Sequence, residues 1–147
     1  MAATVCTEEI YRAFYSQDRT RALFHGHSYC GNPLGCAAAI ASLNVFETEP
    51  VFERIGAIES IHSERLPFFK THPAVADVRL LGTIAAIELH AQDAGYLSQL
   101  RSRLYPFFLD QGVLLRPLGN VLYMVPPYVI QRTDLHYTYD AITKALS

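Results

Sequence analysis

A polar, glycine-spaced loop that runs directly into an apolar helix constrains this chain more than any other feature. The loop extends from His25 to Gly31, and Asn32 followed by Pro33 is the pattern of a helix N-cap and first helical position. Such a loop presents backbone N–H groups and a hydroxyl to an anion. The helix predicted over Asn32–Thr48 is apolar nearly all round, so we expect it to be buried. The residues alone allow two interpretations, a scaffold for an anion site or an ordinary helix start after a solvent loop.

From Val51 onward the hydrophobic pattern predicts helices alternating with pairs of strands. A helix is expected over Val51–Lys70 with Phe52 and His62 on its apolar face, and His62 is interpreted as a core-edge histidine bonded to a neighbour. The expected strands are Ala2–Cys6, Val75–Leu81, and Thr83–Leu89 after a turn or bulge at Gly82. A hairpin of Val113–Arg116 and Val121–Val125 is expected around Pro117–Asn120. The other expected helices are one capped by Thr7, one from about Asp93 to Gln111 that carries Leu97, and a last one capped by Thr133. This order predicts an α/β fold with a largely antiparallel sheet covered by helices.

Composition excludes several classes of protein. The chain has 147 residues, of which 50% are hydrophobic and 18% charged, with a formal net charge of −2. It offers no basic surface for nucleic acid, no apolar run near the ~20 residues of a membrane span, and no signal-peptide pattern. Three cysteines without a CxxC pair predict neither a disulfide framework nor a metal site and favour a reducing, cytoplasmic setting. Cys30, in the loop, is read as a small packing residue, with a reactive thiol as the alternative.

Two motifs resemble one enzyme family. The stretch HGHSYCGNPLGCAAA at His25–Ala39, and the stretch Gly112–Tyr128 with Arg-Pro-x-Gly and a tyrosine seven residues after the arginine, are similar to the class III pyridoxal-phosphate aminotransferases. The resemblance covers essentially the whole chain. It implies the C-terminal portion of a fold-type I pyridoxal-phosphate-dependent transferase that works as a homodimer. A boundary near Pro50 then divides a remnant of the large cofactor-binding domain, residues 1–50, from the C-terminal small domain, residues 51–147.

The resemblance also implies roles for residues of the loop. In the family this loop reaches across the dimer interface to the cofactor phosphate of the other subunit, which makes His27 and Ser28 candidate cofactor-binding residues. The family usually has threonine where this chain has Ser28, and serine keeps the hydroxyl that can donate to a phosphate oxygen. Some relatives carry proline in place of His27, so its backbone is the expected contributor. Gly26 is a candidate substrate-binding residue, because glycine lets a substrate approach the backbone closely.

Arg116 and Tyr123 are the other candidate substrate-binding residues. Arg116 ends an apolar segment, so we expect it to be buried and to need an anionic partner. The guanidinium fork matches a carboxylate, and on the residues alone a substrate carboxylate and a salt bridge to Glu88 or Asp110 are equally good partners. The resemblance favours the substrate, with Tyr123 beside it. Glu88 and His90 could form an acid–base pair, but we interpret both as exposed polar residues at the end of a strand.

The chain lacks a residue that this chemistry needs. Pyridoxal phosphate is held by a lysine, and the two lysines here, Lys70 and Lys144, are expected to be surface charges near helix ends. In the family the cofactor lysine lies shortly before the segment that Ala2–Cys6 resembles. No catalytic residue is therefore assigned, and the chain is expected to be inactive alone.

The second motif narrows the resemblance to the members of the family that serve biotin synthesis. These transfer an amino group from S-adenosylmethionine to 8-amino-7-oxononanoate and give 7,8-diaminononanoate. Two alternatives stay open: a class III aminotransferase with a different amine donor, and a non-catalytic dimerisation module.

Overall fold

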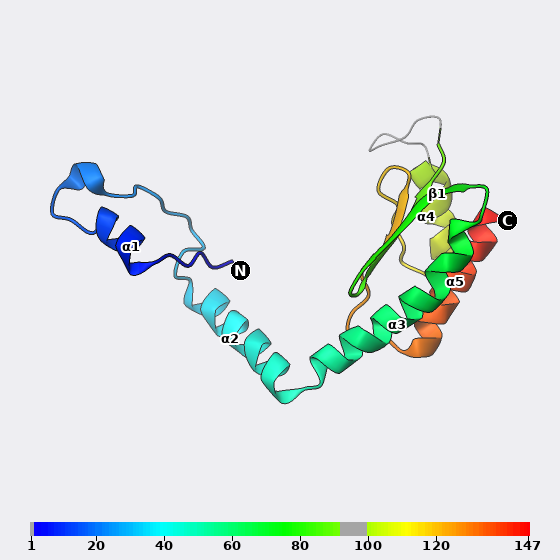
Figure 1. Cartoon of the computed structure of the whole chain (residues 1–147), viewed down its shortest axis with the longest axis horizontal. Coiled ribbons are helices and arrows are strands. Elements are labelled where there is room, and N and C mark those ends of the chain that lie inside the picture. The colour runs from blue at the N-terminus through cyan, green and yellow to red at the C-terminus, as the bar shows by residue number, and fades with distance from the viewer. Residues whose placement is uncertain (1, 92–99) are drawn as a thin grey trace. The chain divides into compact units, whose positions relative to one another are not determined.

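The computed structural model describes residues 2–91 and 100–147, and the chain divides into two compact units. The first unit is Met1–Glu49 and the second is Pro50–Ser147. Each is described by itself, with the element labels of Figure 1.

The first unit contains the helix α1 (Glu8–Phe14), the short 3₁₀ helix η1 (Arg19–Arg21) and the helix α2 (Pro33–Thr48). Thr7 caps α1 as predicted, because its hydroxyl accepts a hydrogen bond from the N–H of Ile10. The strand expected over Ala2–Cys6 is wrong, since these residues have no strand assignment. A strand forms only when its backbone groups pair with another strand, and the described part of the first unit contains no other strand.

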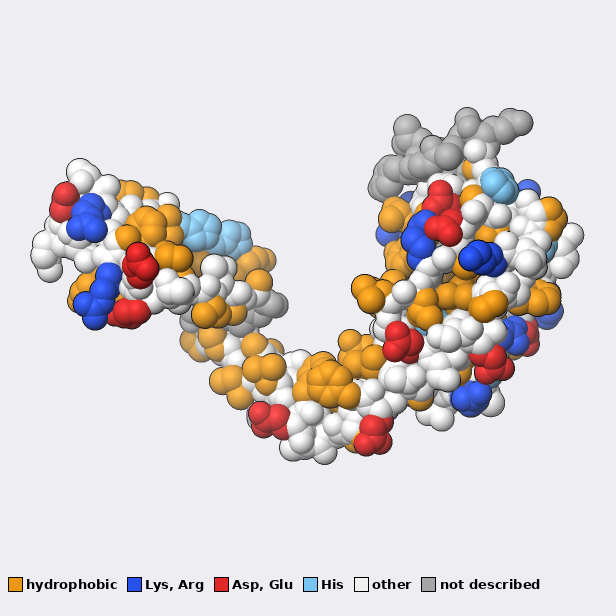
Figure 2. Space-filling model, viewed as in Figure 1, with side chains coloured by type: hydrophobic (Ala, Val, Ile, Leu, Met, Phe, Trp, Pro, Cys, Tyr) orange, Lys and Arg blue, Asp and Glu red, His pale blue; other side chains and the backbone are white. Residues whose placement is uncertain are grey.

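Helix α2 begins as predicted but is not buried. Asn32 is its N-cap, and the Asn32 side chain accepts hydrogen bonds from the N–H groups of Leu34 and Gly35. None of its residues is buried, and Leu34 is 82% exposed, so the expectation of a buried helix is wrong for this chain. A helix that is apolar all round needs cover on every side. The seven-residue α1 and the three-residue η1 have too little surface to provide it. Figure 2 shows the hydrophobic side chains of α2 at the surface.

The second unit is built on a three-stranded antiparallel sheet in the order β1-β2-β3. Its elements are α3 (Val51–Lys70), β1 (Val75–Leu81), β2 (Ile84–Leu89), α4 (Leu100–Asp110), β3 (Val121–Met124) and α5 (Arg132–Leu146). Gly82 turns the chain between β1 and β2 with φ 55°. The predicted fold class, an antiparallel sheet with helices in a partial α/β domain, is confirmed.

One face of the sheet carries the core. Alternate residues of β2 (Ala85, Ile87 and Leu89) are buried, and so are Leu122 and Met124 of β3. Helix α3 packs against β1 and β2, and α5 packs against α3 and α4. In Figure 1 α3 and α5 run side by side.

The helix α3 has the predicted bounds, but its apolar face is shifted by one residue at the start. Val51 is buried, whereas Phe52 is 73% exposed. Successive residues of a helix are turned by about 100°, so the stripe that contains Ile58 and Leu66 continues through Val51 and leaves Phe52 outside.

Three boundary predictions need correction or fall outside the described residues. Val113–Arg116 is not a strand: the N–H of Leu115 donates to the carbonyl of Val113, and this local turn diverts the segment from the ladder. The last helix is capped by Gln131, and Thr133 lies inside it. The expected start of α4 from Asp93, with Leu97, lies outside the described residues.

Candidate functional site

A tight turn after the segment 112–117 positions the downstream motif. Leu118 and Val121 exchange two backbone hydrogen bonds of 2.9 and 3.0 Å around Gly119 and Asn120. Gly119 has φ 61°, whereas no residue other than glycine has positive φ among the described residues. Glycine at the first central position with positive φ fits a type II′ hairpin turn. The predicted turn is therefore present, but its pairing is limited to a single bridge.

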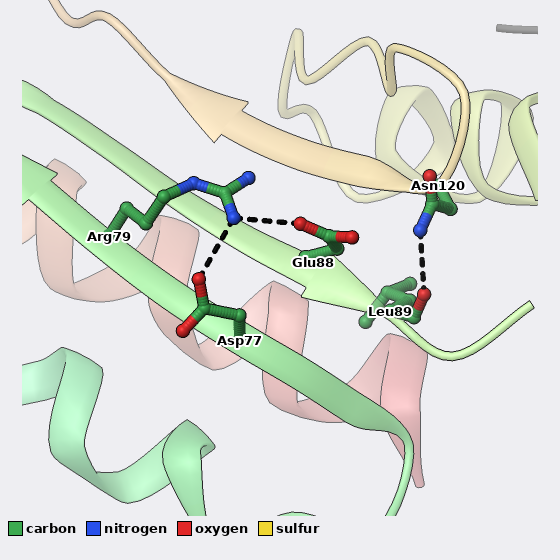
Figure 3. A network of polar contacts seen from close by, with 5 residues as sticks. All are labelled: Asp77, Arg79, Glu88, Leu89 and Asn120. Carbon is green, nitrogen blue, oxygen red and sulfur yellow. Dashed lines mark hydrogen bonds and ion pairs between the residues drawn. The ribbon is translucent and has the colours of Figure 1, made fainter. Parts of the chain in front are cut away.

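Asn120 attaches this turn to the end of β2. Its side-chain Nδ2 donates to the carbonyl of Leu89 at 2.9 Å, and the N–H of Leu89 donates to the carbonyl of Asn120 at 2.9 Å. Asn120 is buried, so both contacts are shielded from water. Figure 3 shows Asn120 beside the end of β2. Asn120 is part of the downstream motif, but no pattern in the sequence indicates the role of its side chain.

Arg116 and Tyr123 line the same pocket. Each lies two residues from the Leu118–Val121 bridge, on opposite sides of the turn. The pocket is open, has a volume of about 580 Å³, and is formed by the segment 112–116, the chain from 123 to 127, and α5. Its wall from α5 includes Asp134 and Thr138. The structure therefore brings together two of the three predicted substrate-binding residues.

Arg116 is exposed, so its expected burial is wrong. Its neighbours Leu115 and Pro117 take the buried positions, which directs the intervening residue outward. Among the ion pairs of the described residues none includes Arg116. The alternative of a salt bridge from Arg116 to Glu88 or Asp110 is therefore wrong for this structure, and the guanidinium is available to an anion.

Glu88 is occupied by another arginine. Arg79 Nη1 donates to Glu88 at 2.7 Å and to Asp77 at 2.9 Å (Figure 3). These hydrogen bonds raise the pKa of the Arg79 guanidinium, with the bond to Glu88 as the larger cause. Because Asp77 and Glu88 lie opposite each other on β1 and β2, Arg79 screens two like charges. His90 is exposed at the strand end, as the preferred reading expected.

The loop before α2 is folded on itself and leaves one hydroxyl open. The N–H of Tyr29 donates to His27 Nδ1 at 3.3 Å, and the two rings have centroids 4.8 Å apart. The N–H of Cys30 donates to the His27 carbonyl at 2.8 Å. Ser28 has no hydrogen bond in the described part of the chain, and a side-chain carbon added at Gly26 would meet nothing within 4 Å. The loop thus offers an unoccupied hydroxyl and an accessible backbone.

The start of α2 is less available to an anion than the sequence suggested. Asn32 Oδ1 accepts from the N–H groups of Leu34 and Gly35 at 3.0 and 3.4 Å, so these two donors are already engaged. A pocket of about 530 Å³ lies beside the loop and is lined by Tyr29, Cys30 and Asn32, among others, but not by His27 or Ser28. Because these two N–H groups are engaged, the exposed Ser28 hydroxyl is the candidate donor to an anion at this loop.

The titratable groups of the core are structural. His62 is fully buried, with Nδ1 2.7 Å from the Tyr139 hydroxyl and Nε2 3.2 Å from the Thr83 carbonyl, which confirms a core histidine bonded to neighbours. Burial lowers the pKa of His62 and raises the pKa of Tyr139. The two lysines lie at helix ends, Lys70 as the last residue of α3 and Lys144 in the last turn of α5, and both are exposed as predicted.

Comparison with known proteins agrees with the motifs. The model of the family "Aminotransferase class-III" matches residues 1–146, and the chain belongs to the class III aminotransferases. The chain is 43% identical over 147 residues to the adenosylmethionine-8-amino-7-oxononanoate aminotransferase of Synechococcus elongatus, covering 99% of this chain and 34% of that protein. It therefore spans about a third of the length of the curated relatives it matches.

Solved structures place the fold in the same family. The crystal structure of adenosylmethionine-8-amino-7-oxononanoate aminotransferase from Methanocaldococcus jannaschii has a TM-score of 0.83 and 35% identity, covering 95% of this chain and 33% of that one. The PMP-bound form of an aminotransferase from Vibrio fluvialis has a TM-score of 0.74 and 26% identity, covering 86% of this chain and 29% of that one. Membership of the family implies a pyridoxal-phosphate cofactor. Within the described residues, no helix is both long and apolar enough to cross a membrane.

Proposed function

We propose that this chain is part of a transaminase that moves an amino group from S-adenosylmethionine to 8-amino-7-oxononanoate and forms 7,8-diaminononanoate for biotin synthesis. One observation carries the proposal: Arg116, without an ion-pair partner in the described chain, shares a pocket with Tyr123. The resemblance over the whole chain to enzymes named for this reaction supports the same substrates.

The pocket suits one end of 8-amino-7-oxononanoate. Its carboxylate would accept two parallel hydrogen bonds from the Arg116 guanidinium. The apolar wall that includes Val113, Leu115 and Ile130 would contact its aliphatic chain. Tyr123 would pack beside the carboxylate end. These contacts would fix the orientation of the substrate toward the cofactor, and holding two reacting groups in the right geometry lowers the barrier of their reaction.

The loop fits the phosphate end of the cofactor. Ser28 has a hydroxyl that can donate, and Gly26 and His27 leave backbone groups accessible. The two lysines of this chain do not fit covalent attachment of the cofactor, because Lys70 and Lys144 are exposed at the ends of helices. Bound pyridoxal phosphate supplies the electron sink and carries the amino group. This chain would contribute phosphate and substrate contacts.

The proposed domain assignment follows from these roles. Residues 1–50 would belong to the large cofactor-binding domain and residues 51–147 would form the small domain, in a homodimer whose loop reaches the other subunit. The absence of a suitable lysine favours one alternative for the isolated chain, a dimerisation module without activity. A class III enzyme with another amine donor is the second alternative.

A chimeric enzyme tests the proposal. In it this chain replaces the matching third of the Synechococcus elongatus aminotransferase. We expect formation of 7,8-diaminononanoate from S-adenosylmethionine and 8-amino-7-oxononanoate, with cofactor absorbance as the check of folding. A chimera that binds cofactor but accepts only another amine donor would favour the alternative enzyme. One that binds cofactor and accepts no donor would contradict the proposal.

A further inference from the structure

We propose that Asn120 is a positioning residue that holds Arg116 and Tyr123 on their shared pocket. This inference rests on the proposed function, because it assumes that Arg116 binds a substrate carboxylate. Asn120 is polar and buried, and it takes no part in the proposed transamination itself.

Asn120 attaches the turn to the sheet. Asn120 is 7% exposed and makes two hydrogen bonds in opposite directions with Leu89, each 2.9 Å long. One comes from its side-chain Nδ2 and the other reaches its backbone carbonyl. The backbone bond extends the pairing of β3 with β2, in which the neighbouring pair is Val121 with Glu88. The side-chain bond adds a contact at the turn itself and ties the turn to the end of β2.

The segment that carries Arg116 pairs with the sheet only weakly. Residues 113–117 form no ladder with β3, and pairing is limited to the Leu118–Val121 bridge. Tyr123, in contrast, lies inside β3 and pairs with Ala86 of β2. The position of Arg116 relative to Tyr123 therefore depends on the turn at one end of the segment. At the other end the N–H of Val113 donates to the Phe108 carbonyl at 2.8 Å, and Leu115 and Pro117 are buried. Asn120 is the side chain that joins this turn to the strand end.

A positioning role and ordinary stabilisation have different effects on ligand affinity. A buried asparagine that only satisfies its own polar atoms would affect unfolding and leave the ligand affinity of the folded chain unchanged. A positioning asparagine changes the ligand affinity of molecules that remain folded. Affinity measured on the folded population is therefore the decisive quantity.

The experiment uses the full 147-residue chain and 1-hexanesulfonate, an anion with an aliphatic tail that stays ionised across the pH range. Binding is followed by NMR at the amide signals of Arg116 and Tyr123. We expect Asn120→Ala to weaken binding roughly 5- to 20-fold while the spectrum stays that of a folded chain. Asn44→Ala, the same change on the exposed helix α2, is the matched control and should bind like the parent.

An isosteric variant makes the test specific for the hydrogen bond. Asn120→Asp keeps the shape, but an ionised carboxylate cannot donate to the Leu89 carbonyl. Binding should be weak at pH 7 and recover as the carboxyl is protonated in acid, because its O–H then donates to that carbonyl. The parent chain should show no such recovery.

The outcomes separate the two proposals. Loss of binding in both Arg116→Ala and Asn120→Ala, with acid recovery in Asn120→Asp, supports positioning. If Arg116→Ala binds like the parent, the proposed function of Arg116 is wrong. If Arg116→Ala loses binding and folded Asn120→Ala keeps it, the positioning role is wrong and the function of Arg116 stands. Should the alanine variant unfold, the pH dependence of the aspartate variant decides alone.

Discussion

His62 Nδ1 lies 2.7 Å from the hydroxyl of Tyr139, and this contact joins α3 to α5 inside the core. The Thr83 carbonyl can only accept, so His62 Nε2 carries the proton, and Nδ1 accepts from the Tyr139 hydroxyl. A single neutral histidine thus connects two helices and the turn between β1 and β2. Each of its ring nitrogens has a partner.

Removing the Tyr139 hydroxyl should destabilise the second unit. Tyr139→Phe leaves Nδ1 of His62 buried without a donor, at a cost of about 1–3 kcal/mol. Urea unfolding of the full chain measures it. Tyr137→Phe, which removes a more exposed hydroxyl bonded to the Gln111 carbonyl, is the control and should cost less. Equal costs in the two variants would contradict the buried hydrogen bond.

The stability of the second unit should fall in acid because of His62. Burial is the main cause that lowers its pKa in the folded state, so the unfolded chain binds more protons once the pH drops below the unfolded pKa of about 6.5. Stability from this group is complete above that pH and is lost as the pH falls toward the lower folded value. The free energy of unfolding should then change with pH by at most about 1.4 kcal/mol per pH unit, the value for one proton.

A variant isolates this contribution. His62→Gln cannot be protonated, so its free energy of unfolding should change less between pH 7.5 and pH 5.5 than that of the parent. Denaturant titrations at both pH values give the comparison. The same pH dependence in both proteins would show that His62 is not the responsible group.

Arg116 should control substrate binding in the chimeric enzyme. Arg116→Ala should lose about 1.5–3 kcal/mol of transition-state stabilisation, the scale for hydrogen bonds to a charged group. Arg116→Lys keeps the charge but loses the two parallel hydrogen bonds of the guanidinium. It should therefore raise the Michaelis constant for carboxylate substrates less than Arg116→Ala does. Steady-state kinetics provide both values, and unchanged cofactor absorbance is the control. A defect in cofactor binding with normal substrate affinity would argue for a structural role.

Ser28 should contribute to cofactor affinity in the same enzyme. Ser28→Ala removes the open hydroxyl and should weaken pyridoxal-phosphate binding by about 1–3 kcal/mol. Ser28→Thr should keep most of the affinity, because the hydroxyl remains. Ser42→Ala on the exposed α2 is the matched control for fluorescence titration of the cofactor. If Ser28→Ala titrates like Ser42→Ala, the phosphate contact lies elsewhere.

The isolated chain should not retain pyridoxal phosphate. Lys70 and Lys144 are exposed at helix ends and have no enclosing site. Incubation with the cofactor followed by dialysis should leave free protein, and mass spectrometry after borohydride should find no stoichiometric adduct. A full equivalent bound to either lysine would contradict this expectation.

Periodic patterns predicted the regular elements well. The alternation in Val75–Leu81 gave β1 its bounds, and the length and helical spacing of Val51–Lys70 gave α3. Val113–Arg116 failed because an apolar run has no alternation that distinguishes a strand from an extended loop. For the same reason the sequence did not reveal that Leu115 points inward and Arg116 outward.

Contacts between residues that are distant in the chain could not be predicted from the sequence. Asn120 bonds to a carbonyl 31 residues away, and no local pattern encodes that partner. The burial of α2 depends on what covers it, which composition does not specify. The sequence did bring Arg116 and Tyr123 together through the motif, and the structure adds the pocket that they share.

The exposed helix α2 has a practical consequence for work with this chain. The side chains of α2 that are apolar and exposed to water include Leu34, Ile40 and Leu43. Exposed apolar surfaces of this kind promote self-association of protein molecules. Light scattering of purified chain should rise with concentration and fall when a mild non-ionic detergent is added. Substituting Leu43 and Ile40 by glutamine should give a better-behaved sample while the fold of residues 50–147 stays intact.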